Sequence, residues 1–167
     1  VQSAEYQRGD YIEDVRAAFG STVPDQVTFD FNRSALDAGS KRALDQQAAW
    51  LRENPTVRVR VTGHTDLVGG EGFNDRLGLR RARSVARYLL RNGVARGRID
   101  MVESRGEREP VVQTEERERR NRRAQTFVSG FARNFVGTGM DGEVAARLYD
   151  NYQSGNFAVT DADAQIN

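Results

Sequence analysis

The sequence contains no cysteine, which excludes a disulfide framework and any metal site built from thiolates. It also lacks a long apolar run, so no segment is expected to cross a membrane as a helix. The chain has a single histidine, His64, which limits the catalytic and metal-binding constellations that depend on imidazole groups. What remains is 167 residues of ordinary globular composition, 38% hydrophobic and 29% charged, enough for one domain with its own core.

Basic and acidic side chains nearly balance, at 25 and 24, but they are unevenly placed along the chain. Between Arg76 and Arg123 there are 15 arginines against 7 acidic residues, whereas residues 137–167 carry 5 acidic residues and one arginine. An arginine-rich stretch of this kind can bind nucleic acid. The stacking aromatic residues typical of such sites are not interleaved with these arginines, so the sequence favours a solvated face and no nucleic-acid partner.

Hydrophobic periodicity predicts four strands. Apolar and polar residues alternate over residues 27–31 and 57–61, and in the second run the valines face the core and the arginines face solvent. Two further strands are expected at residues 99–104 and 120–128. The intervening helices and a polar excursion before the last strand predict an α+β fold, with a mixed four-stranded sheet and helices packed on one face.

Two helices between these strands are predicted from apolar residues at helical spacing. The first runs through Leu36 to Leu51, begins after a capping-box pattern at Ser34 and Asp37, and stops at Asn54-Pro55. The second contains the apolar stripe of residues 82–89.

The two ends of the chain read differently from its middle. Residues 1–23 are an N-terminal extension, polar and irregular apart from one or two helical turns over residues 12–19. The domain is expected to span residues 24–129. Residues 130–167 form a tail with a short helix over 143–152, whose apolar side either packs on the domain or docks a partner protein.

Signals of catalysis are weak. His64 and Asp66 give at most two ligands where a catalytic zinc site typically needs three, and no nucleophile motif accompanies the histidine. The glycine-rich stretch 69–72 lacks the spacing and the lysine of a phosphate-binding loop, and a turn explains it. The sequence therefore predicts no catalytic residues, no metal site, no cofactor and no enzymatic activity.

Arg81 lies four residues after Leu77 and four residues before Val85, so the three side chains lie along one line of the predicted helix. This position places an arginine on the flank of an apolar stripe. A buried guanidinium needs a partner, and Asp66 in the preceding loop can supply one. Two interpretations are open. Asp66 and Arg81 form an ion pair that holds the loop, or they stand open as two poles that clamp a ligand carrying both an ammonium and a carboxylate.

Many residues at fixed spacing resemble the OmpA-like peptidoglycan-binding domain, over roughly residues 24–129. The leading strand is similar at Val27-Thr-Phe-Asp-Phe-Asn32. The matching positions further along are Val61-Thr-Gly-His-Thr-Asp66, Gly69, Asn74, Leu77-Gly78, Arg80-Arg81-Ala82, Gly93-Val94, Gly106-Glu107, Pro110 and Asn121-Arg122-Arg123. Within this family, Leu77-Gly78 and Ser104-Arg-Gly-Glu107 look most similar to the peptidoglycan-associated lipoproteins.

The resemblance implies non-covalent binding of the diaminopimelate residue in the peptidoglycan stem peptide. Asp66 falls at the family position that takes the ligand's ammonium, and Arg81 at the one that takes its carboxylate through a forked contact. The remaining matched positions would line or support the pocket. Phe31, Asn32, Asn74 and Leu77 fall on its walls, and Thr65, Arg122 and Arg123 fall at supporting positions.

The implied role is to tether an outer-membrane or envelope assembly to the cell wall in the periplasm, in association with the outer membrane. The alternative is an interaction subunit that keeps the fold without binding the wall. The chain offers no cysteine for lipidation, so a membrane anchor is expected before Val1 or in a partner. Asn32 departs from the aspartate common in the lipoproteins, and the tail extends beyond the usual end of the domain.

Overall fold

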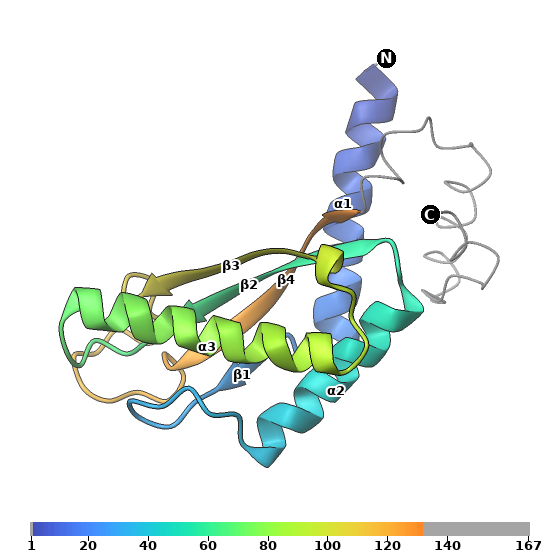
Figure 1. Ribbon diagram of the computed structural model, residues 1–167. Coiled ribbons are helices and arrows are strands. Elements are labelled where there is room, and N and C mark those ends of the chain that lie inside the picture. The colour runs from blue at the N-terminus through green and yellow to red at the C-terminus, as the bar shows by residue number, and fades with distance from the viewer. Residues whose placement is uncertain (1, 132–167) are drawn as a thin grey trace.

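The computed structural model describes residues 2–131, with side chains from Ile12 onward. It contains a four-stranded sheet with the strand order β1-β4-β2-β3, three α-helices and one 3-10 turn (Figure 1). The elements are α1 (Gln2–Thr22), β1 (Gln26–Thr28), α2 (Ala38–Glu53), β2 (Val57–His64), α3 (Glu71–Arg91), η1 (Arg96–Arg98), β3 (Ile99–Gly106) and β4 (Arg123–Phe131). The predicted α+β class and the predicted order of strands and helices are confirmed.

The sheet is mixed, as expected. β2 and β3 are parallel and are joined through α3, whereas β4 runs antiparallel to both β1 and β2. Val61 of β2 lies opposite Val102 on one side and Thr126 on the other. As a result, the carboxyl ends of β2 and β3 and the start of α3 meet at one end of the sheet, where Asp66 also lies.

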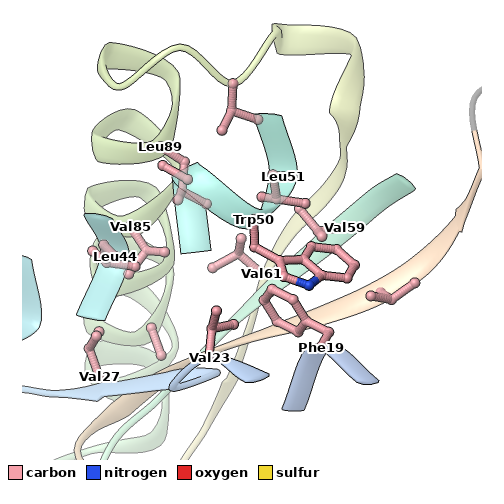
Figure 2. Packing of buried hydrophobic residues seen from close by; sticks show 14 of the residues in the cluster. Phe19, Val23, Val27, Leu44, Trp50, Leu51, Val59, Val61, Val85 and Leu89 are labelled. Carbon is pink, nitrogen blue, oxygen red and sulfur yellow. The ribbon is translucent and has the colours of Figure 1, made fainter. Parts of the chain in front are cut away.

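The core lies between the sheet and the helices. The alternation predicted for β2 is confirmed, because Val57, Val59 and Val61 are buried among the helices. Figure 2 shows Val59 and Val61 beside Leu51 of α2 and Leu89 of α3. All three helices contribute buried residues to this one cluster, so they cover the same face of the sheet.

The N-terminal segment is more regular than predicted. Instead of one or two turns it forms the 21-residue helix α1. Its last turns bring Val15 and Phe19 into the core, and the Phe19 ring meets the Trp50 ring edge-on at a centroid distance of 5.0 Å (Figure 2). The turns predicted over residues 12–19 are therefore part of a longer helix, which burial of Phe19 against Trp50 of α2 stabilises.

Two local predictions near β1 are wrong. The strand ends at Thr28 rather than at residue 31, because the chain enters a turn in which Asn32 has a φ of 56°. Helix α2 begins after Asp37 and not at Ser34. The Asp37 side chain accepts a 2.7 Å hydrogen bond from the Ser40 backbone N–H, and this bond lowers the pKa of Asp37.

The site end of the sheet depends on a close approach of two glycines. A Cβ atom on Gly63 of β2 would lie 1.8 Å from the backbone oxygen of Gly78 in α3, and one on Gly78 would lie 2.2 Å from Ser104 Oγ. Glycine at both positions lets α3 lie directly against β2 and β3.

Residues 132–167, with the helix expected at 143–152, lie outside the described part of the chain. Among the helices of the described residues, none has the length and apolar character needed to span a bilayer.

Candidate functional site

The candidate site lies where β2 ends and the chain turns into α3. Thr65 and Asp66 follow β2 directly, and both are buried, with 2% and 3% of their surface exposed. The Thr65 backbone N–H donates a 2.9 Å hydrogen bond to the Gly106 carbonyl at the end of β3, and the Thr65 hydroxyl donates one of 2.9 Å to the Asp66 carbonyl. These bonds fix the backbone that carries the Asp66 carboxylate.

The Asp66 carboxylate is paired with Arg122. Arg122 Nη1 lies 3.1 Å from Asp66 Oδ2, and the two side chains are 11% and 4% exposed. The backbone N–H groups of Val68 and Glu118 donate longer bonds to the same carboxylate, of 3.3 and 3.4 Å. Arg122 and these two N–H groups therefore satisfy the carboxylate within the protein.

Arg81 is fully buried, and backbone carbonyls hold its guanidinium. Nε donates to the Arg33 carbonyl at 2.9 Å, Nη1 to that of His64 at 2.9 Å and Nη2 to that of Asp30 at 3.2 Å. Burial lowers the pKa of Arg81 to about 10, against the opposing effect of Asp66, so the group remains protonated at neutral pH. Two of the five guanidinium N–H groups take no acceptor among the described residues.

The sequence left two interpretations of Asp66 and Arg81 open, an ion pair or two open charges, and the structure differs from both. The carboxylate of Asp66 forms its ion pair with Arg122, so the predicted Asp66–Arg81 ion pair is wrong. The two groups are not open poles either, since both are buried. They are still close enough for the charge of Asp66 to raise the pKa of Arg81.

Helix α3 supplies Asn74 and Leu77 to the same end. Asn74 is buried, and its Nδ2 donates to the Asp66 and Val68 carbonyls at 3.4 and 3.2 Å and to Glu107 Oε2 at 2.7 Å. The amide therefore links the loop after β2 to the segment after β3. Leu77 is 4% exposed and lies one helical turn before Arg81.

Phe31 and Asn32 lie in the turn that Arg81 holds through the carbonyls of Asp30 and Arg33. Phe31 is half-buried, and the Arg117 guanidinium lies 3.6 Å from the centroid of its ring. Asn32 is exposed and has left-handed backbone geometry, which asparagine tolerates better than most residues. The structure thus places both residues beside Arg81.

Arg122 and Arg123 diverge although they are adjacent. Arg122 points to Asp66, and its Nε donates a 2.9 Å bond to the Phe29 carbonyl. Arg123 points elsewhere, and its Nη2 donates to the Glu109 carbonyl at 3.1 Å. Of these two arginines, Arg122 is the one that hydrogen bonds to Asp66.

Sequence reasoning assigned no role to the residues that hold the segment between β3 and β4. Asn121 is fully buried, and its Oδ1 accepts 2.8 and 2.9 Å bonds from the backbone N–H groups of Val111 and Val112. This clamp places Arg117, Glu118 and Arg122 over the site. Asn121 did appear in a matched motif, and no local pattern reveals a contact of this kind.

His64 is buried at the last position of β2, and its Nδ1 has no hydrogen-bond partner among the described residues. Burial, with smaller effects from Arg123 and Arg105, lowers the pKa of His64 from 6.5 to about 4. The ring is therefore neutral at physiological pH. The described residues contain no group of three or more metal-ligating side chains.

Comparison with known proteins decides the family. Residues 28–124 match the OmpA family, a stretch that covers more than half of the chain and contains every candidate site residue. The chain belongs to the OmpA family. The resemblance seen in the sequence is thereby confirmed, as is the fold expected from it.

Relatives of this OmpA-family chain include a peptidoglycan-associated lipoprotein from Rhizobium meliloti. It is 33% identical over 114 residues, which are 67% of this chain and 64% of the relative. Outer membrane porin F from Pseudomonas fluorescens is 36% identical over 108 residues, 64% of this chain and 33% of the porin. The chain therefore spans about two thirds of the lipoprotein and one third of the porin.

Two solved structures have a similar fold. The peptidoglycan-associated lipoprotein from Burkholderia pseudomallei has a TM-score of 0.59 at 30% identity, over 62% of this chain and 88% of that one. The C-terminal domain of Helicobacter pylori MotB also has a TM-score of 0.59, at 20% identity, over 81% of this chain and 98% of that one. The second likeness bears on the fold alone.

Proposed function

We propose that this OmpA-family domain binds peptidoglycan without covalent chemistry and tethers an envelope assembly to the cell wall. The observation that carries the proposal is the burial of one carboxylate, Asp66, and one guanidinium, Arg81, at the same end of the sheet. The relatives named as peptidoglycan-associated lipoproteins support the substrate class. The corresponding location is the periplasm, in association with the outer membrane.

The ligand group that fits the two charges is the amino-acid end of diaminopimelate, which carries an ammonium and a carboxylate. Asp66 would receive the ammonium, and the two uncommitted N–H groups of Arg81 would receive the carboxylate. Arg122 already neutralises Asp66, so an incoming ammonium would share that carboxylate with it. Phe31, Asn32, Asn74 and Leu77 would surround the ligand, and Thr65, Arg122 and Arg123 would support the walls.

The turn at residues 30–33 controls access to Arg81, because two of its carbonyls accept from the guanidinium. A bound carboxylate would compete with these carbonyls or use the remaining N–H groups. In either case the planar guanidinium of Arg81 is required, because a lysine ammonium cannot donate to both the turn and a ligand carboxylate in the same geometry.

The proposal is tested by retention on purified sacculi, with free diaminopimelate as a competitor. Asp66→Asn preserves shape and removes the charge, and Arg81→Lys preserves the charge and removes the fork. Each variant is expected to lower affinity by roughly 30-fold or more, because Asp66→Asn leaves the ligand ammonium without a counter-charge and Arg81→Lys cannot form the forked contact. Exposed Arg80 is the matched control, and Arg80→Ala should bind like the parent. Retention of sacculi by both folded site variants at the control level would exclude this site.

One observation favours a second candidate function, an interaction subunit that keeps the fold without binding the wall. Asp66 already has a cationic partner, and Arg81 already donates to three carbonyls, so both charges are satisfied within the protein. Under this alternative the parent itself fails to cosediment with sacculi. The same pull-down therefore separates the two functions before any variant is made.

A further inference from the structure

Helix α3 exposes a row of arginines along its whole length. Arg76, Arg80, Arg83, Arg87 and Arg91 are all exposed and recur at intervals of three or four residues. At 100° per residue these positions fall within an arc of about 80°, and at 1.5 Å per residue they span about 22 Å. We call these five residues the α3 arginine row.

The α3 arginine row has no carboxylate partners among residues 12–131, the part whose side chains are described. Some exposed arginines elsewhere are paired, for example Arg108 with Asp75 at 2.6 Å and Arg119 with Asp30 at 2.7 Å. Others, such as Arg42 and Arg96, also have no carboxylate partner among the described residues, but they are scattered and do not form a row. Within the row, Arg80 makes an aromatic contact, since its guanidinium lies 5.9 Å from the centroid of the Phe73 ring. Five adjacent cations without counter-charges repel one another, and an anionic surface relieves that repulsion.

The row is also accessible. The opposite side of α3 faces the sheet through Ala82, Val85 and Leu89, which are buried. Figure 1 shows α3 in front of β2, β3 and β4, with no labelled element over its outer side. Phe73, which is 40% exposed, adds an apolar ring at the N-terminal end of the row.

We propose that the α3 arginine row docks the domain on a bilayer surface rich in anionic phospholipid. Guanidinium groups bind phosphate in a forked geometry, and lipid headgroups diffuse until they match any spacing of cations. The apolar side of α3 is buried against the sheet, so docking rests on the arginines, with Phe73 as an exposed aromatic ring beside them. A nucleic-acid site would instead interleave stacking aromatics with the arginines, and α3 exposes only Phe73.

The choice of a bilayer rests on the envelope location in the proposed function, but the surface is separate from the wall site. Asp66 and Arg81 lie on the buried side of α3 or beyond its start, whereas the row lies on the outer side. Each arginine near an anionic membrane strengthens binding roughly fivefold, and the effect decays over a Debye length. Binding should therefore weaken steeply as salt is added.

The experiment is cosedimentation of the full chain with phosphatidylcholine vesicles, with and without phosphatidylglycerol, at about 0.15 M ionic strength. The parent is expected to bind only the vesicles that contain phosphatidylglycerol. A variant with Gln at Arg76, Arg83, Arg87 and Arg91 should lose roughly several hundred-fold in partition. The matched control removes the same charge elsewhere, with Gln at exposed Lys41, Arg42, Arg96 and Arg105, and should bind as the parent does.

Three outcomes would overturn the proposal. The control variant loses as much binding as the row variant, which would show that vesicle binding depends on net charge and not on the α3 arginine row. A DNA duplex binds the parent more tightly than the vesicles at the same ionic strength, which would assign the row to nucleic acid. The parent fails to bind, and vesicle binding appears only after Asp141, Glu143 and Asp150 are changed to Asn or Gln, which would mean that the acidic tail binds the α3 arginine row.

Asp66→Asn should bind vesicles like the parent, because Asp66 is not part of the row. Failure of the wall-binding proposal can therefore be distinguished from failure of the membrane proposal.

Discussion

Arg81, which is buried, and Arg98, which is half-buried, lie at opposite ends of β2, and each donates three hydrogen bonds to backbone carbonyls. Arg98 donates from Nε to Val57 at 2.5 Å and from Nη2 to Leu51 and Asn54 at 2.8 and 2.6 Å. Burial lowers the pKa of each arginine to about 10. By these measures, the two guanidinium groups are equivalent.

Their surroundings differ. For Arg98, burial is the only cause of the shift, and its three acceptors tie the end of α2 to the start of β2. For Arg81, the charges of Asp66 and Arg122 also act, and its acceptors belong to a turn and a strand end. An arginine that donates to several backbone carbonyls is therefore not a functional signal by itself. The nearby carboxylate distinguishes the candidate binding end from the purely structural end.

The largest expected effect tests how tightly the site end is built. Gly63→Ala would place a methyl group against the backbone of Gly78, so β2 and α3 must separate. We expect a loss of about 3 kcal/mol or more in the free energy of unfolding, measured by urea denaturation. Gly97→Ala, beside Arg98, is the control, because a Cβ atom there meets nothing within 4 Å. Equal stability of the two variants would contradict the tight packing assigned to the site end.

The next prediction compares the two arginines directly. Arg81→Ala and Arg98→Ala each leave three carbonyls without a donor, and each is expected to lower the free energy of unfolding by about 2–4 kcal/mol. Only Arg81→Ala should also abolish retention on sacculi. Denaturation curves and sacculus pull-downs, both below the unfolding temperature of each variant, separate the two effects. Loss of retention in folded Arg98→Ala would remove the functional distinction between the two ends.

A smaller effect is the dependence of stability on pH that arises from His64, the only histidine, which lies at the site end of β2. The folded state lowers the pKa of His64 from 6.5 to about 4, so the unfolded state binds the proton more tightly. His64 therefore destabilises the fold as pH falls through 6.5 toward 4, by about 2 kcal/mol between pH 7 and pH 5. Urea denaturation at the two pH values checks this, with His64→Gln as the variant that should flatten the dependence. An unchanged slope in His64→Gln would assign the pH dependence to carboxylates instead.

The sequence predicted those features of the site end of β2 that depend on hydrophobic periodicity. The alternation in β2, the apolar stripe of α3 and the burial of Arg81 within that stripe follow from side-chain spacing. Asp66 was a candidate because the loop that carries it leads into α3. In each case the relevant residues are neighbours along one element, where burial on one face leaves a regular pattern.

Other parts could not be read from local patterns. Arg122, the partner of Asp66, is 56 residues away along the chain, and the partners of Asn121 lie across a long polar segment. The strand predicted to run to Phe31 ends at Thr28, where the chain turns and presents carbonyls to Arg81. The apolar pattern over residues 12–19 predicted only the last part of helix α1, whose position depends on packing between Phe19 and Trp50.

The sequence by itself determined the order of strands and helices, the faces that are buried and the family motifs, because apolar burial imprints a period of two or 3.6 on each element. The tertiary structure decided which charges meet. Asp66 pairs with Arg122, Arg81 binds backbone carbonyls, and the α3 arginine row lacks a counter-charge among the described residues. Such pairings depend on distances between segments far apart in the chain, and these distances exist only after the elements pack.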